Sequence, residues 1–578
     1  MKRNFGRLVL VAVLSAGLFC LSACGASPSS GNPTSTSASP SSGSPSSADA
    51  SQPSSASQES AKVADPVKVA CENGVMLGRS ADGVASFKGI PFAKPPVGEL
   101  RWKAPQAPEP STAEVECYEF GNVALQFEWP SEPASYSPKS EDCLTLNIWA
   151  DDGAIGSAEP KPVMVFFHGG AYGWGGTTDP MYDGQNFVKA HDDVILVTCN
   201  YRLGLMAWPD FSKIEGGQDY TDINLALRDH IAALQWVQNN IAAFGGDPGN
   251  VTIFGESAGA WSTTSLVISP KARGLFKRAI AQSGQIAFRG RETAQEYANF
   301  IMQAAGAKNM DDLKAISGEE WIKLDLEKGL ADAACYAVVD GDIIPEDVNK
   351  AFEDAAKSGV QLIIGSNQDE WNYFKEDSPG DTEEERLDSW TKSMDETIDE
   401  ARAATNEEGK ATLDELLKYE ESIVPAEYAG DEKVKAALAK SAVISELWRY
   451  EILDFAGRFA DAGGDTRAYL WKAPSTRDNM YKSAVHAVEL AYVFNNLEDD
   501  IYAGVVDPAL AAKVQESWVN FAKTGDPSVD GVAWKAYDTA AKDTMVIEKD
   551  KWECVSDPSK TARELLEKAY GNDPYHVW

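Results

Sequence analysis

Apolar positions along the chain follow two different spacings. Short apolar runs closed by turn residues, at 162–167 and 194–198, are typical of buried strands. Between 221 and 243, apolar side chains recur every three or four positions up to a Gly-Gly-Asp-Pro turn, which predicts a helix. Another strand is expected at 251–254, followed by a helical stretch. Strands and helices in alternation predict an α/β fold, with a mostly parallel sheet covered on both faces.

The first residues have the pattern of an export signal. A basic start with Lys2, Arg3 and Arg7 precedes an apolar stretch that is too short to span a bilayer comfortably. This stretch ends in LSACG, which resembles a bacterial lipoprotein signal, where cleavage precedes the cysteine that receives the lipid. We therefore expect a signal peptide at 1–23 and lipid on Cys24, at the outer face of the cell membrane. An ordinary secretory signal with a chance cysteine is the alternative.

Composition divides the remaining chain into two parts. Residues 24–62 are almost entirely Ser, Pro, Ala, Gly and Thr, which cannot bury enough apolar surface to offset the entropy of ordering. They are expected to form a flexible linker. Residues 63–578 make up the rest of the chain.

The charge and the metal-binding residue types exclude several functions. The net charge of -36 argues against nucleic-acid binding, which requires clustered Lys and Arg. There are no C-x-x-C pairs and the five histidines lie far apart, so neither a metal site nor a cofactor is expected. Export permits disulfides, but the sequence does not choose their pairing. The cysteines concerned are Cys71, Cys117, Cys143, Cys199, Cys335 and Cys554, of which Cys199 is expected to be a buried free thiol.

A Gly-x-Ser-x-Gly sequence follows the strand at 251–254 directly. Its glycines allow a sharp turn that exposes Ser257 at the tip, while the next N–H, from Ala258, can stabilise an oxyanion at a helix N-terminus. Serine needs a base to become a nucleophile. The sequence therefore predicts a serine hydrolase with Ser257 as nucleophile.

A second loop follows the strand at 162–167 and reads HGGAY. Small residues let backbone N–H groups approach a substrate oxygen, as in the oxyanion loop of α/β-hydrolases. His168 precedes the nucleophile in the chain, whereas the base of that fold comes last. We therefore expect His168 to hold the shape of the loop.

Longer motifs resemble the type B carboxylesterase family, which includes cholinesterases and bacterial para-nitrobenzyl esterases. They occur in the order of that family and span most of the chain, which implies that residues 63–578 form one large α/β domain. The motifs are FKGIPFAKPPVGELRWKAP at 87–105, EDCLTLNI at 141–148, NYRLG at 200–204, FGGDPGNVTIFGESAGA at 244–260, RAIAQSG at 278–284, VVDGDIIP at 338–345 and WVNFAKTGDP at 518–527. The resemblance implies the α/β-hydrolase fold, helical insertions around the active site, and hydrolysis of carboxylic esters through an acyl-enzyme.

The resemblance also implies the remaining catalytic residues. The acid of the family maps to Glu370 and its histidine to His486, which gives the order serine, acid, histidine. The oxyanion donors map to Gly170, Ala171 and Ala258. Many relatives have glycine where this chain has Ala171, so we expect the added methyl to narrow the acyl side.

Other family features map onto scaffold and near-site positions. Two structural ion pairs are implied, Arg101 with Glu141 and Arg202 with Asp229. The carboxylates Glu256 and Glu489 match acids near the nucleophile, where they would bias the electrostatics around His486. Cys143 matches one partner of the family's first disulfide, but Ala124 occupies the place of the other. The sequence therefore leaves open whether Cys143 forms a disulfide.

The substrate is less well defined than the reaction. Trp129, Tyr172 and Trp174 lie near the motifs and are candidates to line the site. The acidic, Ala-rich residues 380–440 are expected to form a helical insertion beside it. The expected partner is a small-molecule ester, with the membrane reached through the lipid alone. Alternatives are amide or carbamate hydrolysis by the same triad, or a non-catalytic adhesion protein, although such members typically lack part of the triad.

Overall fold

The computed structural model describes residues 66–126, 138–284, 288–330, 336–376, 378–496, 499–500 and 502–571. The predicted signal peptide, Cys24 and the linker lie outside these residues, as do Trp129 and Cys335. In the described part of the chain, no helix is both long and apolar enough to cross a membrane.

One large twisted sheet runs through the described part of the chain, in the strand order β1-β2-β3-β5-β7-β6-β8-β9-β10-β11-β14-β15, with β4 beside β2. Along this order, neighbouring strands are parallel from β7 to β14 and antiparallel at both ends, while β4 pairs with β2 in parallel. The strands are β1 (Val67–Cys71), β2 (Asn73–Ala81), β3 (Val84–Pro91), β4 (Ser111–Glu116), β5 (Thr145–Asp151), β6 (Lys161–Phe167), β7 (Ile195–Cys199), β8 (Gly246–Glu256), β9 (Arg278–Gln282), β10 (Gln361–Asn367), β11 (Asp465–Trp471), β14 (Asp543–Ile547) and β15 (Trp552–Ser556). A separate pair is formed by β12 (Asp499–Asp500) and β13 (Gly504–Val505).

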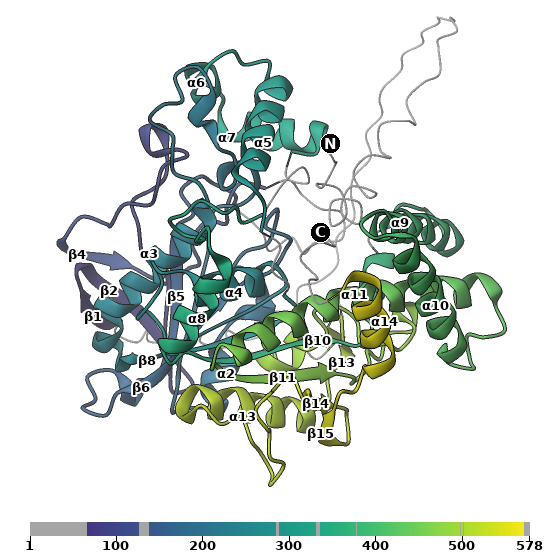
Figure 1. The fold of residues 1–578 in the computed structure, drawn as a ribbon. Helices are drawn as coiled ribbons and strands as arrows, with labels where there is room; N and C mark the ends of the chain where they lie inside the picture. Colours follow the sequence, from purple (N-terminus) through teal and green to yellow (C-terminus); the bar gives the residue numbers. More distant parts are fainter. Residues whose placement is uncertain are drawn as a thin grey trace, which may run out of the picture.

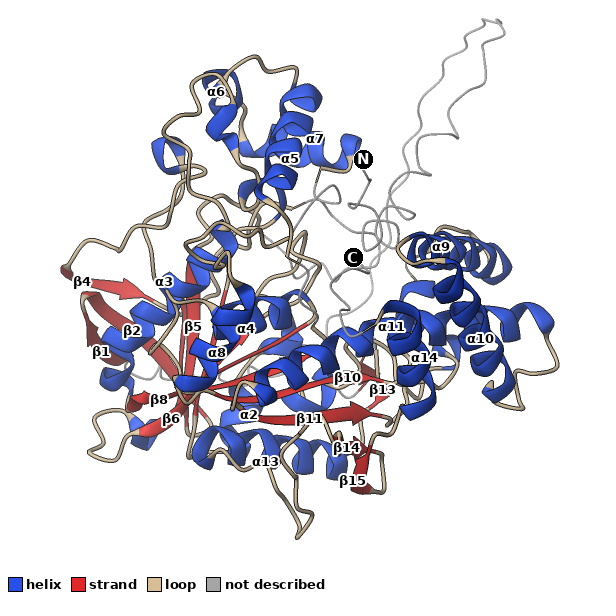
Figure 2. Ribbon diagram, viewed as in Figure 1, coloured by secondary structure: helices blue, strands red, loops and turns tan. Residues whose placement is uncertain are grey.

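Helices cover both faces of this sheet (Figures 1 and 2). One face packs against α3 (Leu225–Asn240), α4 (Ala258–Ile268), α8 (Val348–Lys357) and α11 (Glu432–Asp461). The other face packs against α2 (Gln185–Ala190), α12 (Leu490–Phe494) and α13 (Pro508–Thr524). Two separate apolar cores result, one for each face.

Further helices lie outside these two layers. Figure 1 shows α5 (Arg291–Ala305), α6 (Met310–Lys314) and α7 (Gly318–Lys328) together at the top of the view, apart from the two helical layers. The helices α9 (Glu383–Ala403), α10 (Glu407–Ile423) and α14 (Lys560–Tyr570) pack around α11. Residues 380–440 are thus helical as expected, and α11 extends from them back onto strands β10 and β11.

The predicted strands and the α/β architecture are confirmed, with shifts of a few residues. The helix expected at 221–243 begins later, at Leu225, because Asn224 adopts a left-handed backbone conformation with φ of 55°. Its side chain exchanges two 2.9 Å hydrogen bonds with the backbone of Val338. A long-range contact of this kind overrides the local helical pattern.

The parallel strands determine where the site can form. The carboxyl ends of β6, β8, β9, β10 and β11 all meet at one edge of the sheet. Ligands of open α/β sheets bind outside these ends. The HGGA loop follows β6, the Gly-x-Ser-x-Gly turn follows β8, and Glu370 follows β10.

Candidate active site

Ser257 sits at a sharp turn between β8 and α4. Its φ of 55° and ψ of -123° are strained for a residue with a side chain. The flanking glycines permit the close approach that this turn needs. A Cβ at Gly259 would lie 1.9 Å from the carbonyl oxygen of Phe167, and one at Gly255 would lie 2.5 Å from the backbone of Gly259. A side chain at either position would collide with backbone atoms, so the turn that presents Ser257 requires glycine at 255 and 259.

The loop after β6 brings small residues to the cavity that Ser257 lines. Gly170 has a φ of 102°, and a Cβ there would lie 2.2 Å from the carbonyl oxygen of Trp174. Ala171 also has a positive φ, 48°, in spite of its side chain. Both residues line the same cavity as Ser257. Ala258 begins α4, and N–H groups of a first helical turn have no partner within the helix.

His168 is buried behind this loop. Its Nδ1 lies 2.8 Å from the carbonyl oxygen of Gly169, and its ring stacks on Tyr201 at 4.3 Å between centroids. The hydroxyl of Tyr201 donates to the carbonyl oxygen of His168 at 2.8 Å. Burial lowers the pKa of His168 to about 4, so the ring is neutral near pH 7. These contacts agree with a role in holding the loop.

Glu370 and His486 are brought together from distant parts of the chain. His486 Nδ1 lies 2.7 Å from Glu370 Oε2, and both side chains are buried. The other carboxylate oxygen of Glu370 accepts a 2.7 Å hydrogen bond from the backbone N–H of Asn367. The amide of Asn367 donates to Glu489 at 2.6 Å and to the carbonyl oxygen of Val485 at 2.8 Å. Asn367, which the sequence analysis missed, therefore ties the acid to the histidine loop.

Glu256 faces the opposite side of the imidazole. Its Oε1 lies 3.2 Å from His486 Nε2. Among the described residues, Ser257 and His486 form no direct hydrogen bond, as is common at catalytic sites before substrate binds. His486 thus stands between two carboxylates, with Ser257 next to one of them in the chain.

The electrostatics follow from burial and from these carboxylates. Burial by itself lowers the pKa of His486, but the charge of Glu256 and the hydrogen bond with Glu370 outweigh it and raise that pKa to about 9. Burial raises the pKa of Glu256 to about 8, against the opposing charge of His486. Glu256 and His486 therefore titrate as a coupled pair.

An open cavity contains these groups. Its walls are mainly aromatic, and four of the aromatic side chains were not selected from the sequence: Tyr182, Tyr373, Trp448 and Tyr502. The aromatic lining comprises Trp174, Tyr182, Trp261, Trp371, Tyr373, Phe374, Trp448 and Tyr502. Trp448 comes from α11 and approaches the His486 ring to 5.4 Å between centroids, while its indole N–H donates to the carbonyl oxygen of Ser283 at 3.3 Å.

The three candidate lining residues have different outcomes. Trp174 lines the cavity as expected, whereas Trp129 lies outside the described residues. The expectation for Tyr172 is wrong. Its positive φ turns it into the core, where it is 1% exposed and its hydroxyl lies 2.9 Å from that of Ser262.

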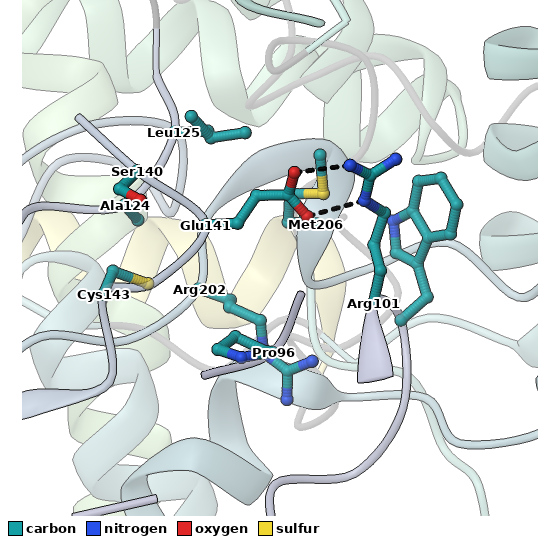
Figure 3. Close-up of a pocket in the computed structure, with 10 residues that line it drawn as sticks. Pro96, Arg101, Ala124, Leu125, Ser140, Glu141, Cys143, Arg202 and Met206 are labelled. Carbon is teal, nitrogen blue, oxygen red and sulfur yellow. Dashed lines mark hydrogen bonds and ion pairs between the residues drawn. The ribbon is translucent and has the colours of Figure 1, made fainter. Parts of the chain in front are cut away.

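The two expected scaffold ion pairs form in the structure. Arg101 binds Glu141 through two hydrogen bonds of 2.5 and 2.6 Å, and Arg202 binds Asp229 through 2.6 and 2.8 Å bonds. Figure 3 shows Arg101 and Glu141 facing each other beside a second, smaller cavity.

Ala124 and Cys143 line this smaller cavity together. Cys143 is a free thiol, as are the other cysteines that the structure describes, including the buried Cys199. The described residues also contain no cluster of His, Cys, Asp or Glu side chains arranged to hold a metal ion.

Comparison with known proteins agrees with this geometry. The model of the carboxylesterase family matches residues 65–567. The chain belongs to the carboxylesterase family. It is 33% identical to a para-nitrobenzyl esterase of Bacillus subtilis, over 86% of this chain and 98% of that protein. It is also 31% identical to carboxylesterase 1D of Rattus norvegicus, over 79% and 84% of the two chains.

Solved structures of the family share the fold. A carboxylesterase from Geobacillus stearothermophilus superposes with a TM-score of 0.73 at 33% identity, over 86% of this chain and 99% of that one. A thermophilic para-nitrobenzyl esterase superposes with a TM-score of 0.72 at 30% identity over the same shares. The protein is therefore an α/β-hydrolase and a serine hydrolase that cleaves carboxylic esters.

Proposed function

We propose that Ser257, His486 and Glu370 are the catalytic triad of this esterase. The observation that carries the proposal is the position of His486, held by Glu370 through Nδ1 in the cavity that Ser257 also lines. In acylation, His486 takes the proton of Ser257 while Ser257 Oγ attacks the ester carbonyl carbon. Glu370 orients the ring and stabilises the imidazolium that forms.

The backbone N–H groups of Gly170, Ala171 and Ala258 are the proposed oxyanion donors. They stabilise charge that develops on the carbonyl oxygen only as the tetrahedral intermediate forms. The C–O bond to the alcohol then breaks, and the alcohol leaves with the proton from His486. Water repeats the sequence on the acyl-enzyme, which releases the acid and restores Ser257.

Replacement of the nucleophile tests this assignment. A Ser257→Ala variant is expected to lose nearly all hydrolysis of a para-nitrophenyl ester while keeping a melting temperature close to that of the wild type, since alanine keeps the Cβ and removes only the hydroxyl. A Ser262→Ala variant, which alters a buried hydroxyl on the same helix, is the matched control. Full activity in Ser257→Ala contradicts the proposal.

The preferred substrates are proposed to be uncharged esters with an apolar or aromatic group. Eight aromatic side chains line the cavity that contains Ser257. An apolar substrate group that packs against them is removed from water, which favours its binding. The relative from Bacillus subtilis is named for para-nitrobenzyl esters, which have this character. Comparing kcat/KM for benzyl and carboxymethyl esters of one acid tests this preference. Equal values for the two esters contradict it.

We also propose that the enzyme is exported and anchored by lipid on Cys24, with residues 24–62 as its tether. The basic start, the short apolar stretch and the small residues before Cys24 support this. In a bacterial host fed radiolabelled palmitate, the wild type is expected to carry the label and a Cys24→Ser variant is not. Equal labelling of both contradicts the anchor, and release of the unlabelled wild type into the medium supports ordinary secretion.

A further inference from the structure

A buried arginine outside the family motifs holds the turn that leads to Glu370. Arg449 lies on α11 and is 3% exposed. Its Nε donates to the hydroxyl of Ser366 at 3.1 Å. Its Nη2 donates to the carbonyl oxygens of Asn367 and Gln368, both at 2.9 Å. One planar group thus fixes three consecutive residues at the end of β10.

The remaining donors of the guanidinium are also satisfied. Nη1 binds the carboxylate of Glu446, one turn earlier on α11, and donates to the hydroxyl of Ser559 at 3.2 Å. All five N–H groups of Arg449 therefore have an acceptor. Such a rigid fork fixes both the position and the orientation of the turn, whereas lysine can supply only a point charge with rotatable donors.

This turn sets the direction of the Glu370 carboxylate. The backbone N–H of Asn367 donates to Glu370 Oε1 at 2.7 Å, and Glu370 Oε2 contacts His486 Nδ1 at 2.7 Å. Arg449 binds Ser366 before that N–H and the carbonyl oxygen of Asn367 after it. A rotation of this peptide would move the carboxylate away from the imidazole.

The positive charge of Arg449 also acts on the contact between residues 366–369 and the segment before His486. Burial raises the pKa of Asp369 to about 6 and that of Glu420 to about 8, and the positive charge of Arg449 opposes both rises. Asp369 Oδ2 accepts a 3.1 Å hydrogen bond from the backbone N–H of Ala484, and its own N–H donates to the Ala484 carbonyl at 2.9 Å. Ala484 lies two residues before His486. Loss of the Arg449 charge would therefore weaken the hydrogen bonds by which Asp369 holds Ala484, and with it the segment that carries His486.

We propose that Arg449 is a positioning residue for ester hydrolysis, which fixes the turn at 366–369 so that Glu370 is aimed at His486. The proposal rests on the role proposed above for Glu370. Arg449 stands behind the turn, while its neighbour Trp448 lines the cavity. Substrate binding should therefore be little affected by its loss, and the chemical step strongly affected.

A double-mutant cycle with Glu370 tests this role. Arg449→Met and Arg449→Lys are prepared in the wild type and in a Glu370→Gln background, and kcat and KM are measured with para-nitrophenyl acetate. Misplacing a catalytic group by about 1 Å can cost about 100-fold in rate, so Arg449→Met is expected to lower kcat by about that factor with little change in KM. Arg449→Lys is expected to fall between Arg449→Met and the wild type.

The background decides between positioning and general damage. If Arg449 acts through Glu370, Arg449→Met should reduce kcat by less than about 3-fold once Glu370→Gln is present, because the two sites are coupled. An equal fold reduction of kcat in both backgrounds, or a change in KM with kcat unchanged, overturns the proposal. If Glu370→Gln by itself keeps the wild-type kcat, the proposed acid is wrong. If Glu370→Gln loses activity but the Arg449 variants keep the wild-type kcat, the proposed triad is supported and the proposed role of Arg449 is wrong.

Two further variants control for folding. Arg458→Met removes another arginine of α11, which binds Asp454 one turn away, and should leave kcat at the wild-type level. If Arg449→Met does not fold, Ser366→Ala removes a single bond of Arg449 and enters the same cycle. It is expected to lower kcat modestly in the wild type and not in Glu370→Gln, and the same loss in both backgrounds overturns the proposal.

Discussion

Replacing Glu256 by glutamine should change the pH dependence of this enzyme in a defined direction. His486 accepts a proton only when it is neutral, so kcat/KM falls at low pH with the pKa of His486 in the free enzyme. The negative charge of Glu256 favours the imidazolium and raises that pKa. Removing the charge should therefore lower the pKa of His486 and move the acid limb of the profile to lower pH.

The expected size follows from the 3.2 Å between Glu256 Oε1 and His486 Nε2. Two unit charges at that distance interact by about 5 kcal/mol at an effective dielectric constant of 20, and by about 1 kcal/mol at that of water. One pKa unit corresponds to about 1.4 kcal/mol. We expect the acid limb to shift by at least about one unit, since the lower energy already gives nearly that much.

The assay is kcat/KM for an uncharged para-nitrophenyl ester over the full range of pH in which the protein is folded. Glu489→Gln should give a smaller shift, because Glu489 binds Asn367 and Gln282 and not the imidazole. Glu353→Gln, which removes an exposed charge beside Lys357, should give none. An unchanged acid limb in Glu256→Gln, or a shift to higher pH, refutes the electrostatic reasoning.

Three substitutions and one thiol assay test the packing and the scaffold. Ala171→Gly relieves a positive φ at a cost of chain entropy, so the free energy of unfolding should change by less than about 1 kcal/mol, while long acyl esters gain in kcat/KM relative to acetate. No gain for long acyl groups contradicts a narrowing by that methyl. Gly259→Ala forces a Cβ against the carbonyl of Phe167 and should destabilise by about 3 kcal/mol or more in urea unfolding, and a neutral result contradicts the close approach. Asp229→Ala leaves the buried Arg202 unpaired and should cost about 3–5 kcal/mol in the same assay, whereas a loss under 1 kcal/mol would show that the pair is dispensable. Thiols that are buried and free should resist Ellman's reagent in the native protein and react after denaturation, and native reactivity argues against their burial: Cys117, Cys143 and Cys199.

Local chemistry explains which parts of the site can be predicted from sequence. Ser257 and the loop at Gly170 follow from short motifs, because each motif contains the glycines that its own turn requires. Glu370 is one carboxylate among many, and only its resemblance to the family motif selects it. His486 is similar, since its partner lies 116 positions away.

Residues that act across the fold left no local signal. Trp448 and Arg449 reach the site through packing of α11 against the end of β10, and no spacing in the sequence records that contact. Asn367 lies only three residues before Glu370, but its amide bonds to Val485 and Glu489 cross more than 100 positions. The prediction that Tyr172 lines the cavity was wrong for the same reason. Its position beside the HGGA motif suggested the cavity, but a positive φ and a bond to Ser262 place it in the core.

Labelling with a fluorophosphonate, followed by peptide mass spectrometry, tests the central claim most directly. An activated serine in an oxyanion site reacts with this reagent, whereas ordinary serines do not. The account predicts one label for each chain, on the peptide that contains Ser257, and none in a folded Ser257→Ala variant. A label on another residue, or no label on an enzyme that still hydrolyses esters, contradicts it.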